Sequence, residues 1–157
     1  MINVRNAVAE DARAIAAVLE KAFIEYRELY TPEGFAATVL NKKKVEQRMS
    51  EGPVWVALDN QQIVGTVAAV AKSKTLYVRS MAIVPAARGK GIGEIMLQHV
   101  QAFATANGHE HMTLSTTPFL SRAIRLYERF GFQRSAEGPS DLFGTPLFTM
   151  AKRNSSN

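Results

Sequence analysis

Apolar residues recur along this chain at two different spacings. Helical spacing with a single apolar stripe marks residues 11–26, 92–107 and 123–130. A further helix is expected from Thr31 to about Met49, because threonine caps a helix, proline suits its first turn, and Gly52-Pro53 ends it. Short apolar or β-branched runs predict strands at 2–5, 54–58, 63–70, 76–84 and 112–116, another beginning at Phe130, and a last one at 146–151. Residues 59–62 join two of these strands as a hairpin, and this order of elements predicts an α/β (α+β) fold.

A glycine-rich turn, Arg88-Gly89-Lys90-Gly91-Ile92-Gly93, connects the strand at 76–84 to the helix that follows. The first N–H groups of a helix have no acceptor within the helix, so such a turn suits a phosphate group. Two common phosphate motifs do not fit the spacing. A dinucleotide fingerprint needs glycine where Glu94 stands, and a P-loop needs glycine where Val84 stands.

The remaining pattern, Arg88-x-x-Gly91-x-Gly93 after Val84-Pro85, resembles the signature of the GCN5-related N-acetyltransferase (GNAT) superfamily. A second stretch, from Ala123 to Phe132, resembles the closing helix of that family, A-I-x-L-Y-E-x-x-G-F. The resemblance covers nearly the whole chain and is strongest between Met81 and Phe132. It implies a single GNAT-like domain with a mixed central sheet of about six to seven strands and about four flanking helices. We expect this domain to cover 1–152 and residues 153–157 to form a frayed polar tail.

The resemblance implies acetyl-CoA as co-substrate. The loop amides would hold its pyrophosphate, and the main chain at a bulge near the end of the 76–84 strand would pair with the pantetheine arm. The expected cofactor contacts are Met81, Ala82, Ile83, Arg88, Gly89, Lys90, Gly91, Ile92, Gly93 and Glu94. Leu120 stands where many members have an asparagine that helps to hold pantetheine. Its hydrogen bond must be absent here or replaced, with Thr116 and Thr117 as candidates.

The activity that the resemblance implies is direct transfer of an acetyl group to a primary amine. Tyr127 matches the tyrosine that protonates the departing thiolate in many relatives, although a core aromatic would also occupy this position. Backbone N–H groups near Ala82 and Ile83 could polarise the thioester carbonyl. At the end of the first predicted helix and in the link that follows it, four residues are candidates for contact with the acceptor, or else are polar and solvated: Glu25, Tyr26, Glu28 and Tyr30. The general base is left unassigned, with the two glutamates as the carboxylates to examine.

Composition narrows the alternatives. A length of 157 residues suits one globular domain, and the absence of cysteine excludes disulfides, thiolate metal sites and an acyl-cysteine intermediate. No apolar run approaches the ~20 residues of a membrane span, and the N-terminus lacks a signal-peptide pattern, so no membrane association and a cytoplasmic location are expected. His109 and His111 lack a third ligand at metal spacing, so we expect no metal and a structural or solvated role for both.

Two other functions and two acceptor classes stay open. The net charge of +5 is scattered, which suits a polyanionic cofactor better than nucleic acid, yet a basic nucleic-acid-binding domain remains the third hypothesis. The other alternative to an acetyltransferase is a coenzyme A-binding module without catalysis. A closed aromatic pocket would favour a small-molecule amine, and an open groove would favour a protein amine. A homodimer is also possible.

Overall fold

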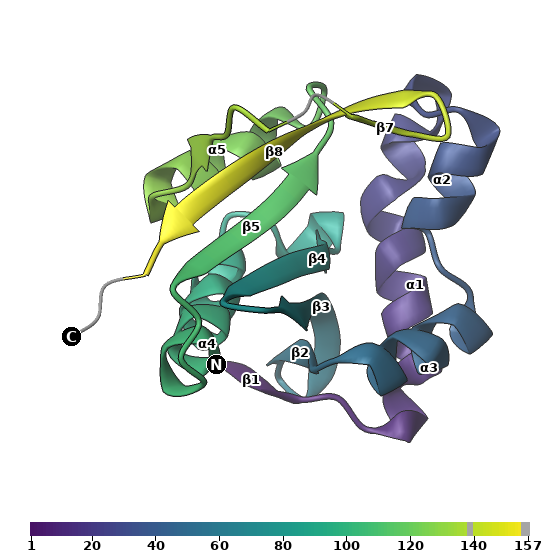
Figure 1. Cartoon of the computed structure of the whole chain (residues 1–157). Coiled ribbons are helices and arrows are strands. Elements are labelled where there is room, and N and C mark those ends of the chain that lie inside the picture. Colours follow the sequence, from purple (N-terminus) through teal and green to yellow (C-terminus); the bar gives the residue numbers. More distant parts are fainter. Residues whose placement is uncertain (138–139, 155–157) are drawn as a thin grey trace.

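The computed structural model of this protein describes residues 1–137 and 140–154, and Figure 1 shows its arrangement. Eight strands form a mixed sheet in the order β1-β2-β3-β4-β5-β8-β6, with β7 paired to β8. The strands are β1 Ile2–Asn6, β2 Val54–Asp59, β3 Gln62–Lys72, β4 Thr75–Ile83, β5 His111–Thr116, β6 Gln133–Arg134, β7 Ser140–Leu142 and β8 Thr145–Arg153. The helices are α1 Ala12–Phe23, α2 Pro32–Thr38, α3 Lys42–Glu51, α4 Ile92–Ala106 and α5 Ser121–Phe130, with 3-10 turns at Ala9–Asp11, η2 Ile24–Leu29 and Pro85–Ala87. The expected α/β domain is confirmed.

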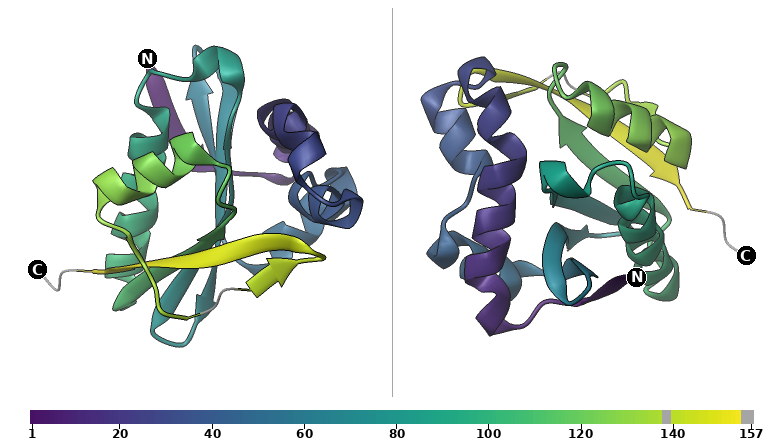
Figure 2. Two further views of the ribbon diagram at one scale, coloured as in Figure 1. Left: turned by 90° about the horizontal axis from the view of Figure 1, so that it is seen from above. Right: turned by 180° about the vertical axis from the view of Figure 1, so that it is seen from behind.

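The helices cover both faces of the sheet. Figure 2 shows α4 and α5 on one face and α1, α2 and α3 on the other. Each face has its own apolar core: Met96 and Val100 of α4 are fully buried on one side, and Ile15 and Leu19 of α1 pack with Val45 of α3 on the other. The amphipathic stripes of the sequence are therefore the faces that these helices bury.

Three predicted boundaries of secondary-structure elements were wrong. The helix expected from 31 to 49 is two helices, because the Asn41 side chain accepts a hydrogen bond from the Lys44 amide at 2.9 Å and caps a new helix there. The helix expected from 11 to 26 ends at Phe23 and continues as the 3-10 turn η2, none of whose residues is buried. Part of the loop expected at 138–141 is strand β7, while residues 138–139 lie outside the described residues.

The C-terminal end of the chain is ordered further than expected. Strand β8 continues to Arg153, and the Asn154 amide donates to the Glu110 carbonyl at 2.8 Å. The Asn154 side chain also donates to the His109 carbonyl at 3.0 Å. The domain boundary expected at 152 therefore falls inside a strand, and residues 155–157 lie outside the described part of the chain.

Strands β4 and β5 separate after a short contact, and this separation creates the site. They pair in parallel only where Thr75–Tyr77 meets His111–Thr113, and the rest of β4 turns away from β5. On its other edge β4 contains a bulge: Thr66 faces Ala82 and Ala68 faces Arg79, so Val67 stands opposite both Ser80 and Met81. Ser80 has φ +55°, which produces the bend. The bulge implied by the family resemblance is present.

Candidate active site

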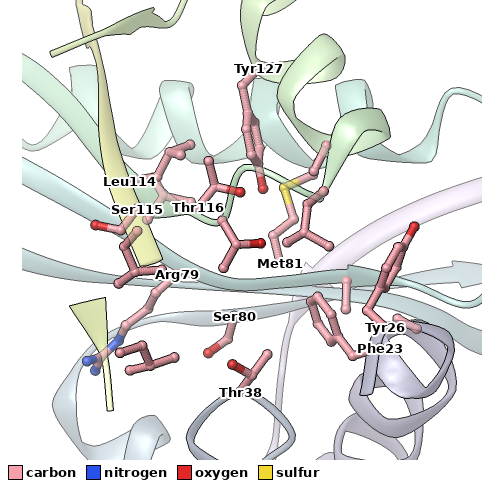
Figure 3. Close-up of a pocket in the computed structure, with 18 of the residues that line it drawn as sticks. Phe23, Tyr26, Thr38, Arg79, Ser80, Met81, Leu114, Ser115, Thr116 and Tyr127 are labelled. Carbon is pink, nitrogen blue, oxygen red and sulfur yellow. The ribbon is translucent and has the colours of Figure 1, made fainter. Parts of the chain in front are cut away.

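A cavity of about 380 Å³ lies where β4 and β5 diverge (Figure 3). Its walls come from β4 and β5, from α5, and from the C-terminal end of α1 with the turn η2. Four charged side chains line it, and all four are arginines: Arg48, Arg79, Arg88 and Arg122. Within residues 1–137 and 140–154, no aspartate, glutamate, lysine or histidine lines this cavity. The site is therefore strongly cationic as well as partly apolar.

The glycine-rich turn next to the cavity has the backbone conformation that its sequence predicts. Gly89 and Gly91 have φ +84° and +76°, values at which a side chain would be strained. A Cβ at either position would meet nothing within 4 Å, so the space above the turn is open. Gly93 is required for helix packing, because a Cβ there would stand 2.5 Å from Leu126 Cδ2 of α5. It allows α4 and α5 to pack closely.

The amides of this turn are available to a ligand. The Arg88 amide donates to the Pro85 carbonyl at 3.2 Å, and the Ile95 amide donates to the Gly91 carbonyl at 3.1 Å. Between them, the amides of residues 89–94 have no acceptor within the described part of the chain. They lie at the N-terminus of a 15-residue helix, where the helix dipole favours negative charge. This arrangement fits a pyrophosphate.

The two cations of the turn are held by carboxylates. Arg88 Nη2 lies 2.5 Å from Glu25 Oε1, and Lys90 Nζ lies 2.9 Å from Asp59 Oδ2. The Lys90 contact contributes most to a lowered pKa of the Asp59 carboxyl. Glu25 is thus paired with Arg88 of the turn and does not itself line the cavity, so its contact with an acceptor stays a prediction.

Polar groups for an amide-containing arm line the cavity between the diverging strands. Beyond Tyr77, the β4 edge that faces β5 has no strand partner among the described strands. The hydroxyls of Thr116 and Thr117 are buried and have no hydrogen-bond partner within the described residues. Buried hydroxyls without partners are costly, so a ligand that bonds to them gains affinity. The cavity therefore fits pantetheine, and Leu120 lines it without a polar group.

Tyr127 belongs to both the core and the cavity. Its ring is 8% exposed and packs edge-on against Phe132 with ring centroids 6.0 Å apart. Figure 3 shows the ring descending from α5 with its hydroxyl directed into the cavity, toward β4. Burial, and then the neighbouring Tyr30, raise the pKa of the Tyr127 phenol well above its usual value, so the group is a hydrogen-bond donor throughout the physiological range.

The residues expected to contact the acceptor are divided by the structure. Tyr26 and Tyr30 line the cavity, with Phe119 packed against the Tyr30 ring at 4.9 Å. Burial raises the pKa of Tyr30 to about 12. Glu28 is exposed and does not line the cavity. Neither of the two glutamates considered as a base therefore lines the space where an acceptor would bind.

The histidines lie away from this cavity. His109 stacks on Phe103 with ring centroids 6.5 Å apart, and His111 is exposed. Over residues 1–137 and 140–154, no three His, Asp or Glu side chains gather as metal ligands would. The described helices also include none that is both long enough and apolar enough to cross a bilayer.

Arg48, Arg79 and Ser80 line the cavity and were not foreseen from the sequence. Arg48 comes from α3 and reaches the β4 bulge, where its Nη1 donates to Ser80 Oγ at 2.5 Å. One signal was available, because Arg79 and Ser80 interrupt a strand whose other predicted residues are apolar or aromatic. What the sequence lacked was the bulge, which sets the direction of the side chains around Ser80.

Comparison with known proteins now assigns the family. Residues 50–134, which make up more than half of the chain, match the model of the acetyltransferase (GNAT) domain. The chain belongs to the GNAT family. Its domain is that of an acetyl-CoA-dependent N-acetyltransferase, and both motifs that suggested the resemblance lie within the matched residues.

Individual GNAT relatives are similar to this chain over different lengths. An N-acetylaspartate synthetase from Danio rerio is 38% identical over 85 residues, which are 53% of this chain and 30% of that protein. The uncharacterized N-acetyltransferase YhfO from Bacillus subtilis (strain 168) is 29% identical over 140 residues, covering 84% of this chain and 90% of that protein. The chain thus spans about a third of the synthetase and most of YhfO.

Solved GNAT structures share the fold over almost the entire chain. PaiA N-acetyltransferase from Thermoplasma acidophilum, in complex with coenzyme A, has a TM-score of 0.81 at 18% identity and covers 98% of this chain and 99% of that chain. The ribosomal-protein-S18-alanine N-acetyltransferase from Escherichia coli has a TM-score of 0.78 at 17% identity, with 99% and 95% covered. At these identities the likeness concerns the fold.

Proposed function

We propose that this chain transfers the acetyl group of acetyl-CoA directly to the primary amine of a small molecule. One observation supports this most: the unpaired edge of β4 and the Tyr127 hydroxyl border one cleft, and Arg88, which directly precedes the free amides of the glycine-rich turn, lines the same cleft. Such a cleft can bind the two substrates together. The absence of cysteine is consistent with transfer that uses no acyl-enzyme thioester.

Acetyl-CoA supplies an activated acetyl group as a thioester. In our proposal the amides of residues 89–94 hold its pyrophosphate, with Arg88 and Lys90 nearby. The β4 edge at Met81, Ala82 and Ile83 aligns the pantetheine arm, and the Thr116 and Thr117 hydroxyls bond to it in place of the family asparagine. Backbone N–H groups of β4 near Ala82 and Ile83 polarise the thioester carbonyl.

The chemical step then needs one nucleophile and one proton donor. The acceptor nitrogen uses its lone pair to form a C–N bond with the acetyl carbon, and the C–S bond breaks with its electron pair moving to sulfur. The Tyr127 hydroxyl donates a proton to this sulfur. The nitrogen gives up one proton, which restores the tyrosine through solvent, so the products are an N-acetyl amide and a free thiol.

The acceptor must reach the cavity as an uncharged amine. Among the described residues no carboxylate or histidine lines the cavity, so water is our proposed proton acceptor. Four arginines line the cavity with only two carboxylates, Glu25 and Glu51, paired to them, and the remaining positive charge lowers the pKa of an amine held beside it. The cavity itself therefore favours the nucleophilic form of the acceptor.

A small-molecule acceptor is favoured by the way the acceptor end is covered. The β7–β8 hairpin lies against α2, with the Thr31 amide donating to Thr145 Oγ1 at 2.9 Å and the Thr31 hydroxyl donating to the Phe143 carbonyl at 2.8 Å. Leu142 and Leu147 of this hairpin line the cavity, as do Tyr26 of η2 and Tyr30 directly after it. The names of the relatives include both N-acetylaspartate synthetase and a ribosomal-protein N-acetyltransferase, so they do not choose between the classes.

The test is release of free thiol from acetyl-CoA over a panel of amines, with Tyr127→Phe as the decisive variant. Phenylalanine keeps the ring and removes the hydroxyl. We expect kcat to fall by about 10²-fold or more, the usual scale for a positioned acid, while coenzyme A affinity and Tm change little. Tyr127→Ala should instead lose roughly 3 kcal/mol of folding free energy, because it leaves a cavity in the core.

A fully active Tyr127→Phe variant would remove Tyr127 from the proposed mechanism and leave it a core aromatic. Coenzyme A binding without thiol release, for every amine tried, would favour a binding module without catalysis. Binding of DNA or RNA that weakens steeply with salt, with no effect of acetyl-CoA, would favour a nucleic-acid-binding domain.

A further inference from the structure

Two arginines stand side by side at the end of the cavity away from the glycine-rich turn. Arg48 comes from α3 and Arg79 from β4, and their side chains are only 24% and 22% exposed. Both line the cavity together with Ser80 and Thr38. Figure 3 shows Arg79, Ser80 and Thr38 on the side of the cavity opposite Tyr127. The guanidinium groups of Arg48 and Arg79 are therefore partly buried beside the space proposed for the acceptor.

The nearby carboxylate of Glu51 neutralises only part of the charge of Arg48 and Arg79. Arg79 Nη2 lies 2.5 Å from Glu51 Oε1, whereas Arg48 Nε lies 4.0 Å from the same oxygen. One carboxylate thus serves two guanidinium groups and leaves a charge of +1. Burial lowers the pKa of Arg48, and the neighbouring Arg79 lowers it further. Arg79 Nε is buried and has no hydrogen-bond partner within the described residues.

An anion other than a side chain would complete this cluster. Glu51 is 41% exposed and does not line the cavity, so it neutralises the outer side of the pair. Guanidinium groups bind planar carboxylates well, because their N–H donors match the two carboxylate oxygens. A buried pair of like charges is unfavourable by itself, and an anion bound between them would relieve it.

The pyrophosphate of acetyl-CoA is not this anion. Arg79 stands four residues before the end of β4, which is roughly 13 Å along a strand, and the amides of the turn begin six residues after Ile83. Arg88 at that turn already pairs with Glu25. The cleft therefore has two separate cationic ends, one beside the free amides and one at Arg48 and Arg79.

We propose that the acceptor of this enzyme is a small amine that also carries a carboxylate, as an amino acid does, and that Arg48 and Arg79 bind this carboxylate. The proposal rests on the acetyl transfer proposed above and names the substrate class for it. Binding the carboxylate at this end directs the amine of the same molecule into the rest of the cavity. The two arginines are specificity determinants and take no part in the proton transfers.

The experiment compares acceptors that differ only in the charged group. For several side chains, thiol release from acetyl-CoA is measured with an amino acid, its carboxamide and its decarboxylated amine, and kcat/KM is corrected to the uncharged amine. We expect the amino acid to be preferred by about tenfold or more. Arg79→Gln should raise its KM by about tenfold or more, while the KM of acetyl-CoA and the rates with uncharged amines stay within about twofold.

Matched variants separate charge from folding. Arg79→Lys keeps the charge without the planar fork and should lose less than Arg79→Gln. Arg13→Gln removes an equal charge from an exposed position on α1 and should have no effect. If the variants reduce transfer to all three acceptors equally, or if the wild type prefers the carboxamide, the carboxylate proposal is overturned and acetyl transfer stands.

A different pattern would reject acetyl transfer while still testing the anion site. If coenzyme A binds but no acceptor releases thiol, binding of N-acetyl amino acids and of their amides is compared by thermal unfolding. A carboxylate-dependent rise in Tm that Arg79→Gln removes would support the anion site alone. No rise with any carboxylate would overturn that site too.

Discussion

At the scale of single residues, the site depends on backbone positions that few side chains tolerate. Gly89 and Gly91 have positive φ, and Ser80 adopts a positive φ at the bulge of β4. The two glycines adopt a positive φ without steric strain, because they lack a Cβ. Ser80 is held by Arg48, which donates to its hydroxyl. The same arginine thus stabilises the bulge and faces the cavity, which connects the shape of the strand with the charge of the site.

Gly91→Asp is expected to weaken coenzyme A binding by about tenfold or more. The carboxylate would stand where the turn amides face the pyrophosphate, and the residue would keep the φ of +76° at a cost of about 1 kcal/mol. Gly108→Asp is the matched control, because Gly108 has φ +75° and equally open space beyond the other end of α4. Both variants should lose similar stability, measured by urea unfolding. Equal coenzyme A affinity in both would contradict the loop assignment.

At the scale of elements, β4 changes its role along its length. Its first residues pair with β3 and β5, its middle bulges at Ser80, and its end has only β3 as a strand partner in the described sheet. The helices on each face then determine what enters the gap: α5 brings Tyr127, α3 brings Arg48, and η2 brings Tyr26. The contact of η2 with the glycine-rich turn, through Glu25 and Arg88, links the acceptor side to the cofactor side.

Glu25→Gln should raise coenzyme A affinity by about two- to fivefold. Arg88 is then released from a carboxylate that competes with phosphate, and a partly exposed ion pair of this kind contributes up to ~1 kcal/mol. Isothermal titration with coenzyme A measures the change. Glu28→Gln is the control, because it removes the same charge from an exposed position of the same turn. An equal gain in the control would show a general charge effect, and no gain in either would mean that Arg88 does not bind the phosphate.

At the scale of the whole molecule, the cleft lies between two separately packed layers. One core joins α4 and α5 to the sheet, and the other joins α1 and α3 to its opposite face. Because β4 and β5 pair over only three residues each, few backbone hydrogen bonds hold the two sides of the cleft together there. A ligand that bridges the gap should therefore stabilise the folded state as a whole.

Coenzyme A at a hundred times its Kd is expected to raise the Tm by roughly 5–10 °C. Binding to the folded state alone adds ~2.7 kcal/mol at this concentration, and each kcal/mol corresponds to about 2–4 °C in a domain of this size. NAD at the same concentration should not shift the Tm, because the turn lacks the dinucleotide spacing. Differential scanning calorimetry provides the measurement, and equal protection by NAD would contradict the assignment of the cleft to coenzyme A.

The sequence by itself determined the α/β fold, the order of its elements and the position of the glycine-rich turn. These depend on apolar periodicity and on glycine conformation, which are properties of neighbouring residues. It also identified residues that border the cleft, including Tyr127, Tyr26 and Tyr30, through a family motif and an aromatic segment. It also named Glu28, which is exposed and outside the cavity lining, because a polar residue in a link gives no indication of the direction in which it points.

Only the tertiary structure decided what the acceptor end contains. Arg48 and Ser80 are 32 residues apart and meet because β4 bulges under α3. Thr31 and Thr145 are separated by 114 residues and join the hairpin to α2. Such contacts depend on strand register and on packing between distant segments, so no local pattern in the sequence encodes them.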